Sequence, residues 1–276
     1  ATLLVGVFFK NSYNLVTNIT YAIIISLLLI IFNSFNNSGN LFSNSFISNS
    51  FTNFFKILIL LGTLFVMLIT QNFIKEMKIN YFEYPLLLLF SVLGMFFMIG
   101  SNDLMSFYLG LELQSLALYI LASIDRDNLK SNESGIKYFV LSALSSGLLL
   151  YGCSLLYGFT GTTNFDEINL NMRLENTGAI FAMVFILAGL AFKVSAVPFH
   201  MWTPDVYQGS PSSVTSFFAV VPKVAGIAIL IRFVQIPFEQ LIDQWKNILV
   251  FMALASMILG AVAAIGQTNI KRLIAY

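Results

Sequence analysis

Long apolar stretches, separated by short polar ones, repeat along the whole chain. Several of these stretches reach the roughly 20 residues that an α-helix needs to cross a lipid bilayer. The pattern therefore predicts an all-α protein, a polytopic transmembrane helix bundle that forms a single domain. The expected spans are a partial one at 1–9 and further ones at 16–33, 54–72, 82–100, 103–122, 137–159, 179–199, 211–234 and 246–266.

The polar connections between these stretches differ in character. Residues 33–53 are rich in Asn, Ser, Gly and Phe and carry no charge, so we expect an exposed connection at the membrane interface. The sequence Ser101-Asn102-Asp103 is short enough for a tight turn, which makes the spans on either side of it antiparallel neighbours. Residues 125–137 are rich in charge and are predicted to form a loop.

The span at 179–199 contains signals that interrupt it. It leads into the sequence FKVSAVPFHMWTPDVYQGSP, in which Lys193 lies at the end of an apolar helix. Pro198 has no backbone donor, so the carbonyl of Val194 loses its helical partner. Pro204 then restarts the chain. We therefore expect a helix that is broken between Lys193 and Pro204.

A lysine inside a membrane helix is energetically expensive. Insertion at the centre of a span costs about 2.5–3.5 kcal/mol. The cost is tolerated where unwound backbone packs against protein or lines a water-filled cavity. On that ground we interpret Lys193 as a functional group. The alternative is a structural lysine whose long side chain reaches the lipid headgroups.

Glu112 is a second ionisable residue within a predicted span. It lies near the middle of 103–122, where a carboxylate needs a cationic partner or a proton. The spacing of four, three and four residues places it on one helical face with Tyr108, Ser115 and Tyr119. This face forms a polar stripe on an otherwise apolar helix.

Lys223 is the third ionisable residue of this kind. It lies in the middle of the span at 211–234, directly after Pro222, which frees the carbonyl of Phe218. Two lysines and one glutamate in separate spans make a stronger functional candidate than any one of them, because intramembrane ionisable residues are functional candidates by default. The alternative is an inert structural ion pair, although a single pair would leave one lysine uncompensated.

The other polar residues near these spans are weaker candidates. His200 follows the helix break and is expected to hydrogen-bond a freed backbone group rather than to titrate. Asp205, next to Pro204, is expected to cap the half-helix that follows. Small residues in the span at 137–159 either line water or let neighbouring helices pack closely. Both interpretations stay open for Ser142, Ser145, Ser146 and Gly147.

Composition supports a membrane protein and argues against several functions. The chain of 276 residues is 58% hydrophobic and 10% charged, whereas soluble domains are about a quarter charged. Cys153 and His200 are the only residues of their types, so this chain by itself offers no disulfide framework, iron–sulfur site, haem site or metal site. A net charge of +1 without a basic cluster gives no reason to expect nucleic-acid binding.

Positive charges are divided unevenly between the two predicted membrane faces. One face collects Lys10, Lys75, Lys78, Arg126, Lys130, Lys137, Lys271 and Arg272, and the other collects Lys56, Arg173, Arg232 and Lys246. The excess on the first face predicts that it is the inside. Lys193 and Lys223 remain, and both fall within the membrane.

Four segments of the chain resemble one known family. They are GLELQSLALY around Glu112, FKVSAVPFHMWTPDVYQGSP around Lys193, VPK at Lys223 and QTNIKRLIAY at the end of the chain. Together they resemble subunit 2 of respiratory complex I, the proton-pumping NADH:ubiquinone oxidoreductase, within its antiporter-like group. The sister subunits 4 and 5 share the P-x-H-x-W-x-P pattern, whereas the PDVYQGSP segment combined with Lys223 is typical of subunit 2.

The resemblance implies a fold of two inverted five-helix repeats, each with a broken helix, of which only the first is expected here. It implies that Glu112 and Lys193 form a pair that tunes the pKa of the lysine, and we expect their charged ends within roughly 4–8 Å of each other. It also implies that Lys223 continues a hydrated axis along the membrane arm. A separate chain or segment is expected to complete the second repeat and to pack against 248–276.

The resulting hypothesis is a membrane-arm subunit that contributes to proton translocation through Glu112, Lys193 and Lys223. No cofactor is expected in this chain, so NADH, FMN, iron–sulfur clusters and ubiquinone belong to partner subunits. The expected partners are other membrane-arm subunits and membrane lipids. The expected location is the mitochondrial inner membrane, with the bacterial plasma membrane as the alternative.

Two competing hypotheses come from other classes of protein. The first is a subunit of a multi-subunit cation/proton antiporter without a redox partner. The scarcity of intramembrane carboxylates for a sodium site counts against it. The second is a scaffold that only connects pumping neighbours.

Overall fold

The computed structural model describes residues 2–9, 12–172 and 177–276, and its regular structure is almost entirely helical. The helices are α1 (Thr2–Phe8), α2 (Ser12–Asn33), α3 (Ser50–Glu76), α4 (Glu83–Gly100), α5 (Leu104–Ala122), α6 (Leu129–Thr160), α7 (Phe165–Asn171), α8 (Thr177–Val194), α9 (Trp202–Gly209), α10 (Ser212–Gln235), the 3-10 turn η1 (Glu239–Leu241), α11 (Ile242–Ile265) and α12 (Ile270–Ala275). Two short strands, β1 (Gly39–Leu41) and β2 (Phe46–Ser48), pair antiparallel.

Eight helices of the described part of the chain are long and apolar enough to cross a membrane. The predicted all-α, polytopic transmembrane bundle is therefore confirmed. Ala1, Lys10 and Arg173, which entered the predictions above, lie outside the described residues.

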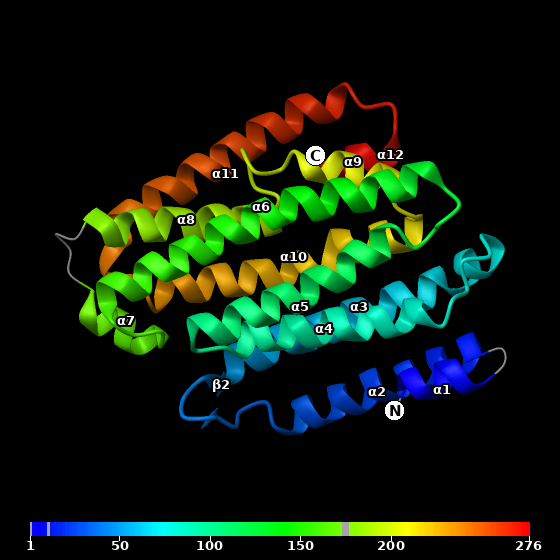
Figure 1. Ribbon diagram of the computed structural model, residues 1–276, viewed down its shortest axis with the longest axis horizontal. Coiled ribbons are helices and arrows are strands. Elements are labelled where there is room, and N and C mark those ends of the chain that lie inside the picture. The colour runs from blue at the N-terminus through cyan, green and yellow to red at the C-terminus, as the bar shows by residue number, and fades with distance from the viewer. Residues whose placement is uncertain (1, 10–11, 173–176) are drawn as a thin grey trace.

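The membrane-crossing helices run side by side along the long axis of the molecule (Figure 1). α4 packs along α5, α6 packs along α8, and α10 packs against α3, α4 and α8. The short helices α9 and α12 lie together at one end of the bundle, whereas α7 and the strands lie at the other end (Figure 1). α11 lies at the periphery, and Met252 is its one buried residue.

The connection between α4 and α5 makes these helices antiparallel neighbours, as predicted. The carboxylate of Asp103 caps α5 by accepting hydrogen bonds from the backbone nitrogens of Met105 at 2.8 Å and Ser106 at 3.1 Å. Further along, Gly94 of α4 faces Gly110 of α5, and a Cβ on Gly110 would lie 3.0 Å from the Gly94 carbonyl oxygen. The two glycines therefore allow a close approach of the helix backbones.

The predicted loop at 125–137 is wrong over most of its length, because α6 already begins at Leu129. The side chain of Asn128 caps the helix by accepting a hydrogen bond from the backbone nitrogen of Lys130 at 3.0 Å. Glu133 and Lys137 lie one helical turn apart and form an ion pair of 2.7 Å. Capping and charge pairing thus extend α6 beyond the apolar stretch that hydrophobicity alone predicts.

Residues 34–49 of the uncharged connection are exposed or half-buried, as predicted, and they also contain regular structure. The strands β1 and β2 form a hairpin within it. The backbone nitrogen of Asn102 donates a hydrogen bond of 2.8 Å to the carbonyl of Ser45. The hairpin is therefore attached to the turn between α4 and α5.

The helix break is confirmed where the prolines predict it. α8 ends at Val194 and α9 begins at Trp202. Ser195 follows α8 with a φ of 62°, in the left-handed region that ends many helices. Pro204 lies in the first turn of α9, where a backbone donor has no helical acceptor to serve. Pro222, in contrast, lies inside α10, which continues through it.

The predicted division of charge between the two faces agrees with the arrangement of the connections. The α3–α4 connection, the α5–α6 connection, α9 and α12 lie at the same end of the bundle (Figure 1). The lysines and arginines assigned to the inside, apart from Lys10, lie in these segments or in the adjoining ends of α3 and α6. The α4–α5 turn, α7 and the α10–α11 connection lie at the opposite end, which we call the outer end.

We expect Gly110→Ala to destabilise the bundle. The added methyl group would meet the backbone of α4, and overpacking of this kind costs about 1–3 kcal/mol. Gly147→Ala on α6 is a matched control, since a Cβ there meets nothing within 4 Å. Thermal unfolding of the two variants in detergent measures the difference. Equal melting temperatures would contradict the role of Gly110 in helix packing.

Candidate functional site

Lys193 lies in the last turn of α8 and is 8% exposed. Its ammonium donates hydrogen bonds to the hydroxyl of Ser115 at 2.8 Å and to that of Ser142 at 2.7 Å. Ser115 belongs to α5 and Ser142 to α6, so three helices meet at this nitrogen. The ammonium is therefore held at the protein interior and does not reach toward lipid headgroups.

The two serines connect Lys193 to a wider polar cluster. The Ser142 hydroxyl also accepts a hydrogen bond of 2.7 Å from Tyr119, and the Ser115 hydroxyl donates one of 2.7 Å to the carbonyl of Leu111. Both serines are almost fully buried. A hydroxyl that accepts one hydrogen bond and donates another can connect a cation to its surroundings without carrying a charge.

Glu112 lies one helical turn from Ser115 on the same face of α5. Its carboxylate acts electrostatically on Lys193, but no ion pair of 4.0 Å or less joins these two residues. The Oε1 atom of Glu112 is buried and has no hydrogen-bond partner among the described residues. Tyr108, partly buried on the preceding turn, lies beside this carboxylate. The predicted stripe thus gathers around Lys193, while a direct Lys193–Glu112 contact is not made.

Lys223 satisfies the backbone that the helix break leaves open. Its ammonium donates a hydrogen bond of 3.0 Å to the carbonyl of Val194, the group that Pro198 deprives of its helical partner. It also donates one to the hydroxyl of Ser195, and its charge lies 5.3 Å from the centre of the Trp202 ring. Lys223 therefore caps α8 from the neighbouring helix α10.

Further hydrogen bonds satisfy the polar groups of the broken segment between α8 and α9. The indole nitrogen of Trp202 donates a hydrogen bond of 3.0 Å to the carbonyl of Phe192, and Thr203 donates one of 2.7 Å to the Ser195 hydroxyl. The backbone nitrogen of Val197 donates one of 3.0 Å to the hydroxyl of Ser256 on α11. Buried backbone groups without such partners would cost free energy, so these contacts make the break tolerable.

His200 lies within the broken segment and is 8% exposed. Its imidazole lies against the backbone of Pro198, and the ring centre is 6.0 Å from that of Tyr276. The Nδ1 atom is buried and has no hydrogen-bond partner among the described residues. His200 therefore lies next to the break but outside the hydrogen-bonded cluster around Lys193.

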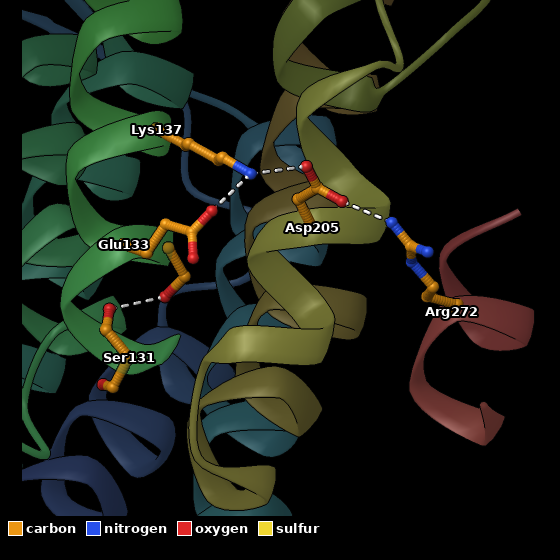
Figure 2. A network of polar contacts seen from close by, with 6 residues as sticks. Ser131, Glu133, Lys137, Asp205 and Arg272 are labelled. Atoms are coloured by element: carbon orange, nitrogen blue, oxygen red, sulfur yellow. Dashed lines mark hydrogen bonds and ion pairs between the residues drawn. The ribbon is translucent and has the colours of Figure 1, made fainter. Parts of the chain in front are cut away.

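The prediction that Asp205 caps a half-helix is wrong. α9 begins after Met201 without a side-chain cap, and Asp205 lies inside its first turn. The carboxylate of Asp205 instead lies between Lys137 of α6, at 2.9 Å, and Arg272 of α12, at 2.5 Å (Figure 2). The hydrogen bond from Lys137 and that from Arg272 hold the pKa of Asp205 below its usual value.

Two contributors to the site and its surroundings were not identified from the sequence. Ser142 was one of several serines whose role stayed open, and only its contact with Lys193 distinguishes it. Arg232 was assigned to the outer face, yet it is 3% exposed. Its position near the end of α10 gives no sign of burial, since arginines are common at the ends of membrane helices.

The described residues contain no group of three or more His, Cys, Asp or Glu side chains placed to hold a metal ion. Cys153 is a free thiol that is buried in α6. The site is thus built from an ammonium, hydroxyls and a carboxylate, all groups that can hold or exchange a proton.

A membrane helix that breaks just after a buried lysine agrees with the antiporter-like fold that the sequence predicts. The family model described as "NADH:quinone oxidoreductase/Mrp antiporter, TM" matches residues 101–276, more than half of the chain, and the chain belongs to this family.

Bacterial relatives are similar over almost the entire chain. NADH-quinone oxidoreductase subunit N of Pelagibacter ubique is 59% identical over 275 residues, which cover 99% of this chain and 58% of that protein. Subunit N of Bartonella bacilliformis is 54% identical over 285 residues, which cover 100% of this chain and 58% of that protein. The chain thus spans less than two thirds of the length of these curated relatives.

Solved structures share the fold. A chain in respiratory complex I from Thermus thermophilus with bound aureothin has a TM-score of 0.81 and 30% identity, covering 100% of this chain and 61% of that chain. A chain in the Mrp complex from Dietzia sp. has a TM-score of 0.84 and 24% identity, covering 99% of this chain and 54% of that chain. The second similarity concerns the fold alone.

We expect the contact between α9 and α12 to weaken in acid. The pKa of Asp205 is lowered from its usual 3.8, so its ion pairs stabilise the contact fully above that value. Their contribution is lost as the pH falls through the lowered pKa. Hydrogen-exchange protection of α12 should therefore decrease as the pH falls below about 4.

Asp205→Asn should abolish this pH dependence and lower the protection of α12 at neutral pH. Asp243→Asn changes an exposed carboxylate in the first turn of α11 and serves as the matched control. Equal protection of α12 in the Asp205 and Asp243 variants at neutral pH would contradict the role of Asp205 in docking α12.

Proposed function

We propose that this chain is part of an antiporter-like, membrane-arm subunit of an NADH:quinone oxidoreductase and that Lys193 carries protons in it. The observation that supports the proposal most is the position of the Lys193 ammonium. It is buried among three membrane helices, and its two hydrogen-bond partners are neutral hydroxyls. The relatives named subunit N support the choice of complex.

The partners of Lys193 suit reversible protonation. Neutral hydroxyls can accept hydrogen bonds from an ammonium and can donate them to the amine that remains after a proton leaves. A direct and fully paired contact with a carboxylate would instead hold the lysine in its charged form. Because Glu112 does not contact Lys193 directly in this structure, its carboxylate is free to become the partner of the ammonium in another state.

A proton carrier also has to work against the membrane potential. Moving one charge against 100 mV requires about 2.3 kcal/mol. At about 1.36 kcal/mol per pKa unit, this corresponds to a change of about 1.7 units. A lysine that alternates between hydroxyls and a carboxylate changes its proton affinity by a similar amount, because a nearby opposite charge shifts a pKa by about 1–3 units.

Lys223 extends the site across the helix break. Lys193 and Val194 are adjacent in the chain, and the Val194 carbonyl accepts a hydrogen bond from Lys223, so both lysines lie at the last turn of α8. We propose that a proton moves between the Glu112–Lys193 side and the Lys223 side through rearrangement of this turn. Pro198 serves by leaving the Val194 carbonyl without a helical partner, and Pro204 lies in the first turn of α9, where the helix resumes.

The proposal places the redox chemistry in partner subunits. NADH, FMN, iron–sulfur clusters and ubiquinone are expected there, and the membrane arm supplies the neighbouring chains. A further segment or chain is expected to complete the second repeat next to 248–276. Equivalence to subunit 2 of the mitochondrial enzyme is part of the proposal. The bacterial relatives favour the plasma membrane over the mitochondrial inner membrane.

A subunit of a cation/proton antiporter without a redox partner is the second candidate. It is favoured by the TM-score of 0.84 with a chain of the Mrp complex from Dietzia. The identity of 24% with that chain is well below the 59% with subunit N of Pelagibacter ubique. We therefore prefer the complex I assignment. Co-purification of flavin and iron–sulfur proteins with the native assembly distinguishes the two candidates.

We expect both Lys193→Met and Lys193→Arg to lower NADH-driven proton uptake by about tenfold or more, the effect of losing a positioned proton-transfer group. Methionine keeps the apolar stem but has no proton site. Arginine keeps the charge but does not release its proton at physiological pH. Proton uptake is measured in membrane vesicles and normalised to assembled complex. Quinone reductase turnover should fall with it.

Lys246→Met is the matched control, because Lys246 is an exposed lysine on the polar end of α11. It should pump normally. Full pumping with arginine at position 193 would reduce Lys193 to a structural charge.

A further inference from the structure

Arg232 is a buried cation that the proposed proton route does not use. It lies near the end of α10 and is 3% exposed. One guanidinium nitrogen donates hydrogen bonds of 2.5 Å to the carbonyls of Ile99 and Ser101, and the other donates one of 3.3 Å to the side chain of Asn102. These contacts fix the guanidinium beneath the turn between α4 and α5, at the outer end of the bundle.

Neutral groups supply the hydrogen-bond acceptors of Arg232. No carboxylate lies within 4.0 Å of it among the described residues. The nearby Asp166 is exposed, and its carboxylate accepts a hydrogen bond of 2.9 Å from the Asn102 side chain. The other side of the guanidinium faces Phe165, whose ring centre is 5.7 Å away. The positive charge of Arg232 is thus only partly compensated.

A second cation approaches the same turn. Lys56 of α3 is half-buried, and a Cβ on Gly100 would lie 3.8 Å from its ammonium. The charges of Lys56 and Arg232 act on each other. Two positive charges on α3 and α10 therefore converge on the outer ends of α4 and α5.

This pair of cations lies between the level of Lys223 and the outer end of the bundle, although Arg232 and Lys223 leave α10 on opposite sides. Arg232 and Lys223 are nine residues apart on α10, about 14 Å along the helix axis. A proton or another cation that left the buried site toward the outer end, between α4, α5 and α10, would approach both positive charges.

We propose that Arg232, assisted by Lys56, forms an electrostatic barrier that closes the outer end of this helix group to protons and other cations. An arginine suits this role because its guanidinium keeps its charge at physiological pH. Arginines that line narrow passages can exclude protons and cations by charge. The barrier prevents a proton held near Lys193 from leaking outward. The inference rests on the proposed function only in assuming that Lys193 holds a proton.

The test uses passive proton conductance of vesicles that contain the assembled complex, without NADH. A pH gradient is imposed, and its decay is followed with a pH-sensitive dye. Arg232→Gln, which keeps some hydrogen bonds but loses the charge, should speed the decay by about tenfold or more. Arg232→Lys, which keeps the charge, should decay like the unmodified complex. Lys246→Gln removes an exposed cation of α11 and should also leave the decay unchanged.

If the pH gradient decays slowly with Arg232→Gln, the barrier is refuted. It is also refuted if the glutamine and lysine variants leak protons equally, because the guanidinium would then act through packing and not through its charge. If the glutamine variant does not assemble, Lys56→Gln decides. The barrier predicts a smaller but measurable leak for it, and no leak would refute the barrier.

The double variant Lys193→Met with Arg232→Gln separates this inference from the proposed function. Loss of the leak in the double variant supports the barrier and places Lys193 on the route. A leak that persists still supports the barrier, but it counts against Lys193 as the carrier.

Discussion

A single buried ammonium determines much of this structure. Lys193 lies where a charge is costly, and the helices around it provide hydroxyls at hydrogen-bonding distance. Ser115 and Ser142 come from different helices, so the ammonium can be satisfied only when α5, α6 and α8 pack together. The same requirement makes the site sensitive to small movements, because a shift of any one helix changes the partners of the charge.

The helix break solves a second problem of the membrane interior. Backbone carbonyls left free within a membrane need partners from the protein, and at the end of α8 side chains of other segments supply them. Trp202 pairs with the carbonyl of Phe192, and Lys223 pairs with that of Val194. Lys223 therefore meets a structural need of the break, and it is also one of the residues proposed to carry protons. A change in its charge would alter the end of the helix that carries Lys193.

The sequence predicts the helices and the position of the break because both depend on local properties. Apolar length sets the spans, and Pro198 alone predicts the free carbonyl of Val194. The partners of the site could not be predicted in the same way. Ser142 and Lys193 are 51 residues apart in the chain, and Asp205 and Arg272 are 67 residues apart. Nothing in the local sequence distinguishes these contacts from other polar positions.

Arg232 is a residue whose burial the sequence did not predict. A cation near the end of an apolar span has the same sequence pattern whether it faces the headgroups or lies inside the bundle. The count of charges on each face therefore assigned it to the surface, and only packing against the α4–α5 turn shows its burial. The early start of α6 at Leu129 has a similar origin, because capping and ion pairs stabilise helix beyond the apolar region.

The central claim is that Lys193 exchanges partners within a buried, three-helix site. High-resolution cryo-electron microscopy of the assembled complex, at rest and during NADH-driven turnover, tests it most directly. We expect the Lys193 nitrogen within hydrogen-bonding distance of Ser115 and Ser142 in one state. In another state we expect it closer to Glu112, directly or through one water. A nitrogen bonded to both serines in every state, or one that points into lipid, would contradict the claim.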